Sequence, residues 1–441
     1  MMMDTEENTL SHRRGLWILS PLAVFFLLYV LVSLCSGDFY KMPVSVAFMA
    51  ASAWALALFR RVPFEEKLDI FSRGAAHRNI MMMVWIFLMA GAFARAAGEM
   101  GAVDAAVNLT LHLMPPGMLL AGLFLAACLI SLSIGTSVGT IVALMPVAMG
   151  LAAKAGFEVP LVAAVVVGGA FFGDNLSFIS DTTIAATRTQ GCSMQAKFRA
   201  NFAIVLPAAL LALGLYIALG WQQAAVAQPG EVEWLRVLPY FIVLFLAVAG
   251  VNVLLVLFLG ILATGAVTLG CGGAFEGWLA ALGQGVLGMG ELTIVTLLAG
   301  GLLGLIRHFG GIRYVIRQLA LLMRGPRSAE LGIGIMVAMA NLCTANNTVA
   351  ILSVGDIAHH IAQRYGIPPA RAASLLDTFS CLVQGALPYG AQLLMGAQLA
   401  GVSALQIIPH LFYPMLLGGS ALLFILLRPR PAAEQAPLPS A

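Results

Sequence analysis

The chain has 441 residues, of which 61% are hydrophobic and 10% are charged, and its formal net charge is +3. Soluble domains carry about 25% charged residues, so this composition excludes an ordinary soluble protein and places most of the chain in lipid. The small net charge argues against nucleic-acid binding. The six cysteines form no CxxC or Cys/His pattern, which argues against a zinc site or a disulfide framework.

Twelve apolar segments follow one another along the chain. Arg13 and Arg14 precede the first one, residues 16–35, whose length suits a membrane helix better than a signal peptide. The other segments of the first half are residues 42–59, 80–97, 118–153, 160–187 and 202–221, and those of the second half are 237–251, 252–270, 292–306, 331–361, 372–399 and 405–427. Polar residues interrupt the fourth and the fifth segment of each half.

This common order indicates an internal duplication. A shift of 210 residues places the polar break Thr136-Ser137 on Asn346-Asn347 and Asp174 on Gln384, although few residues are identical. Interrupted helices in matching positions of two halves are typical of the binding site of a transporter.

The basic residues predict that the two halves are inverted. Arg13, Arg14 and the basic cluster within residues 60–78 place these parts in the cytoplasm, because cytoplasmic loops are rich in Lys and Arg. Residues 98–117 contain no Lys or Arg, which places them outside the cell. In the second half, residues 271–291 lack Lys and Arg, whereas five arginines lie within residues 307–327. Lys154 is the exception, on the outer side.

We therefore predict an all-α polytopic membrane protein of two inverted repeats. About ten crossings and two re-entrant hairpins account for the apolar segments, with broken helices at the bilayer midplane. The predicted parts are a cytoplasmic N-terminal segment (1–15), the first repeat (16–222), an extracytoplasmic linker (223–236), the second repeat (237–427) and a cytoplasmic tail (428–441).

Two carboxylates, Asp174 and Asp181, lie within the apolar segment 160–187. A charge at bilayer depth costs roughly 2.5–3.5 kcal/mol, so such side chains face a polar cavity, an ion or each other. Two carboxylates in one low-dielectric cavity do not both ionise easily, so one can exchange a proton for a cation near neutral pH. Neutral oxygens accompany them, from Asn175, Ser177, Ser180 and Thr182. Helix capping is the alternative role for both acids, and Asp181 precedes Thr182 as a cap would.

Polar residues also interrupt both predicted hairpins: Thr136 and Ser137 in the first, and Asn346, Asn347 and Thr348 in the second. A non-helical stretch in lipid must satisfy its backbone groups through protein, water or ions. Oxygen-rich tips suit a hard cation, and the alternative is that they only cap helices.

The second broken segment contains one acid, Asp377, with Gln384 and Gln392 around a Pro-Tyr-Gly break. Asp377 is either a third cation ligand, with Asp174 and Asp181, or a structural residue bonded to Thr378. At the position that matches Asp174, Gln384 cannot carry a proton, so we expect Asp174 to carry it. The sequence has no HExxH, G-x-S-x-G or Walker A motif, so we predict no enzyme activity and no cofactor.

Residues 173–183, GDNLSFISDTT, resemble the Gly-Asp-x-x-Ser-Pro-x-Ser-Asp-Thr-Thr signature of the NhaC-type sodium/proton antiporters of the ion-transporter superfamily. Residues 345–348 and 375–392 are also similar to members of this family. The resemblance implies re-entrant hairpins, Na⁺ and H⁺ as coupling ions, and a homodimer. The proline of the signature is Phe178 here, so we expect the helix break to rely on Asn175 and the hydroxyl groups instead.

We therefore predict Na⁺/H⁺ antiport in a bacterial inner membrane, through a midplane carboxylate site with Asp174, Asp181 and Asp377 as Na⁺ ligands. The predicted partners are the lipid bilayer and the two ions, and no nucleic acid. The open alternative is Na⁺- or H⁺-coupled transport of an amino acid or a small organic acid, including dicarboxylate/lactate exchange, for which Gln384 and Gln392 offer neutral donors. A passive channel is disfavoured because polarity is concentrated at two tips and two breaks.

Overall fold

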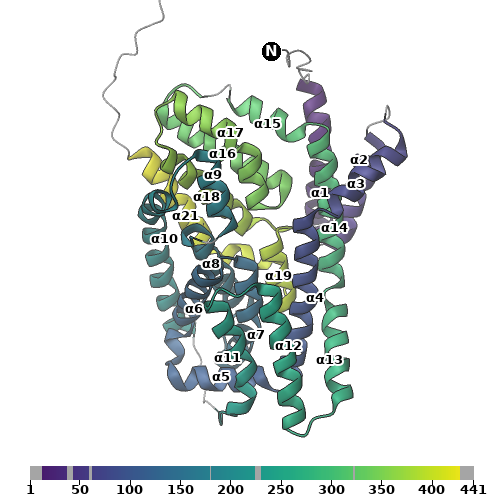
Figure 1. Cartoon of the computed structure of the whole chain (residues 1–441), viewed down its shortest axis with the longest axis vertical. Coiled ribbons are helices and arrows are strands. Elements are labelled where there is room, and N and C mark those ends of the chain that lie inside the picture. Colours follow the sequence, from purple (N-terminus) through teal and green to yellow (C-terminus); the bar gives the residue numbers. More distant parts are fainter. Residues whose placement is uncertain are drawn as a thin grey trace, which may run out of the picture.

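The computed structural model describes residues 12–36, 43–58, 62–178, 180–223, 230–320 and 323–427. These ranges contain helices and no strand, which confirms the predicted all-α class (Figure 1). The tail 428–441, residues 224–229 of the predicted linker and most of the predicted N-terminal segment lie outside the described residues.

The order of the helices repeats along the chain. The first half comprises α1 (His12–Ser36), α2 (Val44–Leu58), α3 (Phe64–Ala75), α4 (Arg78–Glu99), α5 (Ala102–Leu113), η1 (Pro116–Met118), α6 (Leu119–Ile134), α7 (Ser137–Ala155), α8 (Val159–Leu176), α9 (Asp181–Gln190) and α10 (Met194–Gln223). The second comprises α11 (Trp234–Val248), α12 (Val253–Gly270), α13 (Phe275–Gly288), α14 (Gly290–His308), α15 (Gly311–Ala320), α16 (Pro326–Thr344), α17 (Asn347–Arg364), α18 (Pro369–Ala386), α19 (Ala391–Ala400), α20 (Ala404–Ile407), η2 (Ile408–His410) and α21 (Phe412–Leu426). Helices α18 and α19 begin and end 210 residues after α8 and α9. The inverted orientation of the halves stays a prediction.

Many of these helices have the length and composition of membrane spans. Seven in the described ranges qualify, or eight if the pair Pro369–Ala400 and Ala404–His410, bent by 97°, counts as one span. Four shorter apolar helices, at residues 15–28, 44–58, 234–248 and 412–426, coincide with further predicted crossings. The chain is therefore a polytopic membrane protein, and the number of ten crossings stays a prediction.

Both predicted hairpins are present as pairs of adjacent helices, α6 with α7 and α16 with α17. Gly135 ends α6 with a φ of 72°, and Ala345 ends α16 with a φ of 47°. A left-handed conformation is easy for glycine but uncommon for alanine, and such strain often accompanies functional sites. Each arm of the first pair is long enough to cross a bilayer alone, so re-entry stays a prediction.

Several segments that we expected to be loops are helices: α3, α5, α13 and α15. They were missed because charged, polar or glycine residues interrupt each of them, so no continuous apolar run marks these helices. Helix α13 leads directly into α14, and α4 packs against α13 while α3 packs against α14. A Cβ atom on Gly91 of α4 would lie 2.3 Å from the carbonyl oxygen of Gly285 of α13, so glycine permits this close approach.

Lys154, the exception in the charge pattern, has a local role. Its Nζ donates a hydrogen bond to Asn108 Oδ1 at 2.7 Å and lies 3.8 Å from Asp104 Oδ1. Asn108 also accepts a hydrogen bond from the Gly230 N–H at 3.2 Å and donates one to the Glu231 carbonyl at 3.0 Å. The lysine therefore helps to hold the segment between the two halves against α5 and α7.

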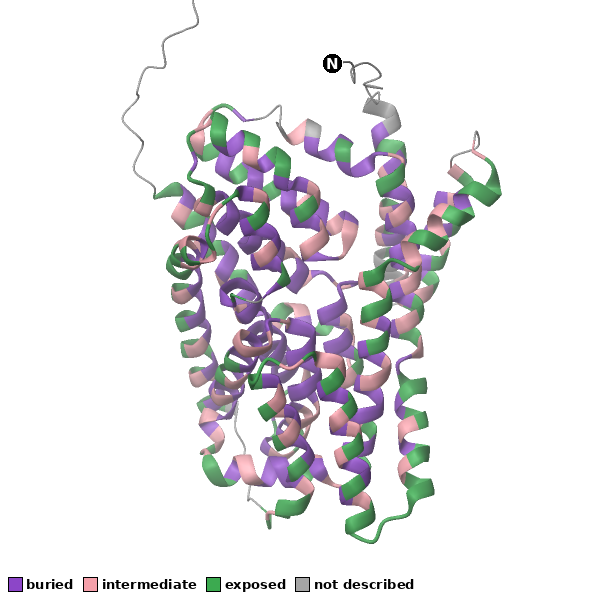
Figure 2. Ribbon diagram, in the orientation of Figure 1, coloured by how far each residue is buried: buried purple, intermediate pink, exposed green. Residues whose placement is uncertain are grey.

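Helices α8 and α18 form the centre of the fold. Almost every residue of α8 is buried, as is most of α18 (Figure 2). Helix α8 packs against α6, α7 and α18. A helix that is buried on all sides cannot turn its polar residues to water, so the polar residues near the ends of these helices face one another inside the protein.

Candidate ion-binding site

Asp174 lies in the last turn of α8 and binds the tip of the first hairpin. Its Oδ1 accepts the Ser137 N–H at 3.1 Å, and its Oδ2 accepts the Ser137 hydroxyl at 2.6 Å. Ser137 is the first residue of α7, so the carboxylate lies at a helix N-terminus, where the helix dipole favours negative charge. Asp174 is only 4% exposed, and the structure therefore brings together two residues that the sequence predicted for the site.

Two glutamines extend this contact to the tip of the second hairpin. Gln392 Nε2 donates to the Ser137 hydroxyl at 3.0 Å, and Gln384 Nε2 donates to Gln392 Oε1 at 2.8 Å. Gln384 Nε2 also donates to the Ala345 carbonyl at 3.1 Å. A continuous chain of hydrogen bonds thus runs from Asp174 through both tips, as expected if they contribute to one site.

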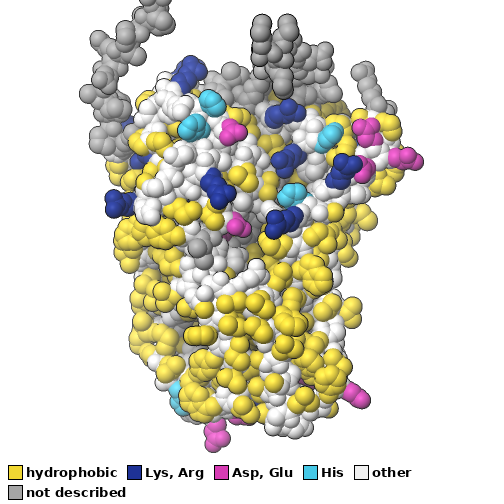
Figure 3. Space-filling model, in the orientation of Figure 1, with side chains coloured by type: hydrophobic (Ala, Val, Ile, Leu, Met, Phe, Trp, Pro, Cys, Tyr) yellow, Lys and Arg dark blue, Asp and Glu magenta, His cyan; other side chains and the backbone are white. Residues whose placement is uncertain are grey.

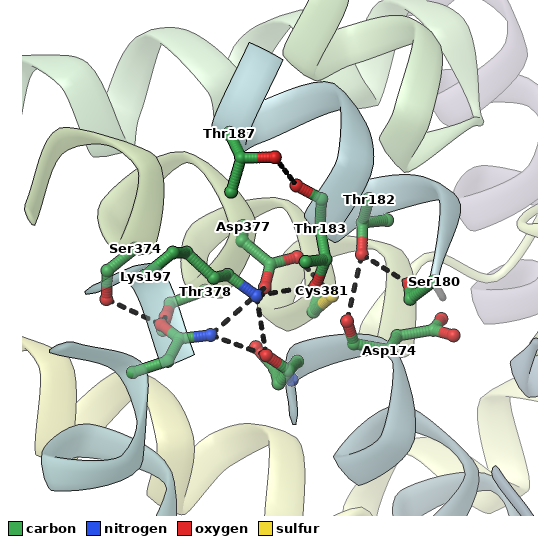
Figure 4. A network of polar contacts seen from close by, with 12 residues as sticks. Asp174, Ser180, Thr182, Thr183, Thr187, Lys197, Ser374, Asp377, Thr378 and Cys381 are labelled. Carbon is green, nitrogen blue, oxygen red and sulfur yellow. Dashed lines mark hydrogen bonds and ion pairs between the residues drawn. The ribbon is translucent and has the colours of Figure 1, made fainter. Parts of the chain in front are cut away.

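A second polar centre lies beside the first, and sequence reasoning missed its main residue. The rule that places basic residues in cytoplasmic loops would put Lys197 in such a loop, but the residue belongs to α10 and is 1% exposed. It forms an ion pair with Asp377 of α18, which is 0% exposed (Figure 4). Lys197 Nζ also donates to the Asn175 carbonyl at 2.6 Å and to the Thr183 hydroxyl at 2.7 Å.

Asn201, also missed, completes this centre. Its Nδ2 donates to the Asn175 carbonyl at 2.7 Å and to Asp377 Oδ2 at 3.0 Å. A polar pair at positions i and i+4 shares one helical face, so the spacing of Lys197 and Asn201 at the start of an apolar helix was the available signal.

The other predicted residues lie around these two centres with different roles. Asp181 is exposed in the first turn of α9, and it is not among the buried residues. Thr182 donates to the Asp174 carbonyl at 2.9 Å and is 2.8 Å from the Ser180 hydroxyl, while the Ser177 hydroxyl donates to the Leu132 carbonyl at 2.8 Å.

One asparagine of the second tip, Asn346, acts as a helix cap in this structure. Asn346 Oδ1 accepts the Val349 N–H at 2.9 Å, and Asn347 Oδ1 accepts the Thr348 N–H at 3.1 Å. Thr136 precedes α7 as its N-cap residue, without a side-chain capping bond. The capping role that the sequence left open therefore applies to Asn346, while Asp174 and Ser137 carry the contact between elements.

Some buried oxygens near these residues lack a hydrogen-bond partner. Among the described residues these atoms include Asn175 Oδ1, Asn341 Oδ1 and Gln384 Oε1. A buried polar atom without a partner is costly, and a cation would satisfy it. Within the same ranges, no group of three or more His, Cys, Asp or Glu side chains could hold a metal ion, so a cation here would need neutral oxygens as well as carboxylates.

Phe178 lies at the break between α8 and α9, where the resemblance expects proline. Its ring stacks on Phe198 of α10, with centroids 5.0 Å apart and planes 16° apart, and Phe198 stacks on Phe202 at 5.8 Å. The break is therefore attached to α10, the helix that carries Lys197.

We expect Phe178→Ala to lower the free energy of unfolding by about 1 kcal/mol, because an aromatic pair contributes roughly 0.5–1.5 kcal/mol beyond its buried area. Phe178 is 45% exposed, which limits the loss. Thermal unfolding of the purified protein measures it. Phe258→Ala on α12, with a similarly exposed ring (49%), is the matched control, and an equal shift in both variants would contradict a role for the stack.

The chain is similar to known antiporters. The family described as "Na+/H+ antiporter family" matches residues 11–221 and 235–428. The Na(+)/H(+) antiporter NhaC of Bacillus subtilis (strain 168) is 24% identical over 376 residues, which are 76% of this chain and 80% of that protein. The Malate-2H(+)/Na(+)-lactate antiporter of the same organism is 25% identical over 189 residues, which are 42% of this chain and only 39% of that protein. Because the family match covers nearly the whole chain, this integral membrane protein belongs to the Na⁺/H⁺ antiporter family.

Proposed function

We propose that the protein exchanges Na⁺ for H⁺ and that both ions compete for the carboxylate of Asp174. The supporting observation is that Asp174 is buried, bonded to the first residue of α7, and without a basic partner among the described residues. A buried carboxylate without a counter-ion is costly, so a proton or a cation that binds there is stabilised. Because the carboxylate accepts only one of them at a time, binding of one releases the other.

The remaining Na⁺ ligands would be neutral oxygens. Asn175 follows Asp174 directly, and Gln384 is bonded to Ser137 through Gln392. The side-chain oxygens of Asn175 and Gln384 have no hydrogen-bond partner in the described part of the chain. Carbonyl and carboxylate oxygens are the ligands that hard cations prefer.

Everted membrane vesicles test this proposal directly. Respiration acidifies the vesicle interior and quenches a ΔpH-sensitive dye. Addition of Na⁺ should then restore the fluorescence, because Na⁺ enters as protons leave. Vesicles that contain the protein and quench normally, yet show no recovery above vector controls with Na⁺ or Li⁺, would contradict the proposal.

We also propose that both termini lie in the cytoplasm of a bacterial cell. The Lys and Arg side chains on the visible face gather in its upper part, while the lower half is mostly hydrophobic (Figure 3). Cytoplasmic ends are rich in basic residues, so this end is assigned to the cytoplasm.

Cysteine labelling tests this orientation. In a variant without the six native cysteines, Arg313→Cys on α15 should react with a membrane-impermeant maleimide only after the cells are permeabilised. Glu276→Cys on α13 should react in intact cells, and both positions are exposed. The reverse pattern would show that the orientation is wrong.

Coupled transport of an organic acid or an amino acid is the second candidate. The name of the lactate antiporter relative favours it, as do the unpartnered amide oxygens of Asn341 and Gln384. Uptake of radiolabelled malate, lactate or amino acids driven by a Na⁺ gradient would distinguish it from simple antiport. The homodimer that the family resemblance implies remains a proposal, and crosslinking in native membranes tests it.

A further inference from the structure

Lys197 is a buried cation that the exchange proposed above does not use. Its ammonium has three N–H donors, and the structure provides three acceptors: Asp377 Oδ2, the Asn175 carbonyl at 2.6 Å and the Thr183 hydroxyl at 2.7 Å. The charge is therefore both paired and fully hydrogen-bonded, which is the condition under which a buried ion pair is tolerated.

The carboxylate of Asp377 likewise has partners within the protein. Its Oδ2 accepts from Lys197 and from Asn201 Nδ2, and its Oδ1 lies 3.7 Å from Cys381 Sγ. Asn201 is itself held by the hydroxyls of Ser374 at 2.5 Å and Thr378 at 3.1 Å. Asp174 differs, because its carboxylate accepts hydrogen bonds from Ser137 and has no ion-pair partner among the described residues.

The contacts of Lys197 also cross the break in the first broken helix. Asn175 belongs to the end of α8, Thr183 belongs to α9, and Asp377 belongs to α18 of the second half. One ammonium group thus fixes both sides of the break to the opposite half, next to Asp174 (Figure 4).

We propose that Lys197 is a positioning residue whose ammonium group neutralises Asp377 in place of a transported ion. This role rests on the proposed Na⁺/H⁺ exchange. Asp174 is then the one carboxylate that binds Na⁺ or H⁺. The site has the same net charge with either ion bound, because Asp174 is neutralised and the Lys197–Asp377 pair is neutral. Exchange is therefore electroneutral, with one Na⁺ for one H⁺. This differs from the sequence-based prediction that Asp377 is itself a Na⁺ ligand.

Purified protein in proteoliposomes tests the charge balance. A pH gradient drives ²²Na⁺ uptake while K⁺ and valinomycin set the membrane potential. A potential of about 100 mV changes the equilibrium accumulation of an ion that moves with one net charge roughly 50-fold. We expect the Na⁺ accumulation ratio of the wild-type protein to be independent of the potential. A roughly 50-fold dependence would overturn this inference alone, whereas absence of any Na⁺/H⁺ exchange would overturn the proposed function and this inference with it.

Charge-removing variants test the role of Lys197. Lys197→Met leaves Asp377 as a second unpaired carboxylate, so Na⁺ activation should change from hyperbolic to sigmoidal and become sensitive to the potential. The double variant Lys197→Met/Asp377→Asn has neither charge, so its Na⁺ activation should be hyperbolic and independent of the potential, although its KM should rise because the contacts of Lys197 with Asn175 and Thr183 are lost. A merely structural pair would not produce this pattern.

Two further measurements complete the test. Lys154→Met, which removes a lysine remote from the site, is the matched control and should leave the shape of the Na⁺ curve unchanged. If the double variant folds but its proton release no longer responds to Na⁺, then Asp377 binds the transported ion and the inference is wrong. If Lys197→Met fails to fold, the inference is still tested by the potential dependence of the wild-type protein and by the Na⁺ curve of the double variant.

Discussion

Replacing Asp174 by asparagine is expected to reduce Na⁺-dependent proton release in everted vesicles by at least about 100-fold. Asparagine has nearly the same shape, and its side-chain oxygen can still accept the Ser137 N–H, so the fold should persist. It cannot take up a proton or neutralise Na⁺, however. Removing one partner of a buried charge interaction costs about 3–5 kcal/mol, and 3 kcal/mol corresponds to more than a 100-fold change in an equilibrium constant.

Asp181→Asn provides the matched comparison, because it makes the same chemical change seven residues along the chain. Asp181 is exposed in the first turn of α9, so we expect at least about half of the wild-type activity to remain. Expression level and elution in size-exclusion chromatography control for folding of both variants. Equal loss of activity in the two would contradict the assignment of the exchanging carboxylate to Asp174 alone.

The elements of the Asp174 centre were visible in the sequence because each one interrupts an apolar segment. Asp174 and Ser137 are polar residues where hydrocarbon-facing side chains are expected, and they contact each other in the structure. Gln384 and Gln392 were expected at the site for the same reason, and they join the two tips. Irregular polarity within a membrane segment is thus a local signal that sequence reasoning can use.

Lys197 could not be assigned in this way. The rule that basic residues lie in cytoplasmic loops takes account of charge and not of burial, and it treats Lys197 and Arg199 alike. In the structure Lys197 is buried and Arg199 is exposed, because residues two apart lie on nearly opposite faces of a helix. The partner, Asp377, is 180 positions away along the chain, and only packing of α10 against α18 brings the two together.

The short connecting helices were missed for a related reason. Helices α3 and α15 contain several charged residues, so no continuous apolar run marks them. Their positions depend on packing against α14, which is a property of the assembled fold. The helical class and the order of the segments could therefore be predicted, whereas the contacts between distant segments required the structure.

The buried ion pair should also dominate the response of stability to mutation. We expect Lys197→Met or Asp377→Asn alone to lower the free energy of unfolding by about 3–5 kcal/mol, because either change leaves an unpaired charge in the interior. The double variant leaves no buried charge, and Asn201 can still donate a hydrogen bond to an asparagine at position 377. It should therefore recover most of the loss. Thermal unfolding in detergent, followed by tryptophan fluorescence, compares the three variants with wild type.

An exposed ion pair is the control for this experiment. Arg236 and Glu233 are 2.8 Å apart, with side chains 37% and 58% exposed, and such surface pairs contribute about 0–1 kcal/mol. Glu233→Gln should therefore scarcely move the midpoint of unfolding. If the double variant of Lys197 and Asp377 were as unstable as either single variant, the loss would come from packing and hydrogen bonding and not from an unpaired charge. Recovery in the double variant would instead mean that Lys197 and Asp377 stabilise the fold as a neutral unit, which is the charge state that electroneutral exchange at Asp174 requires.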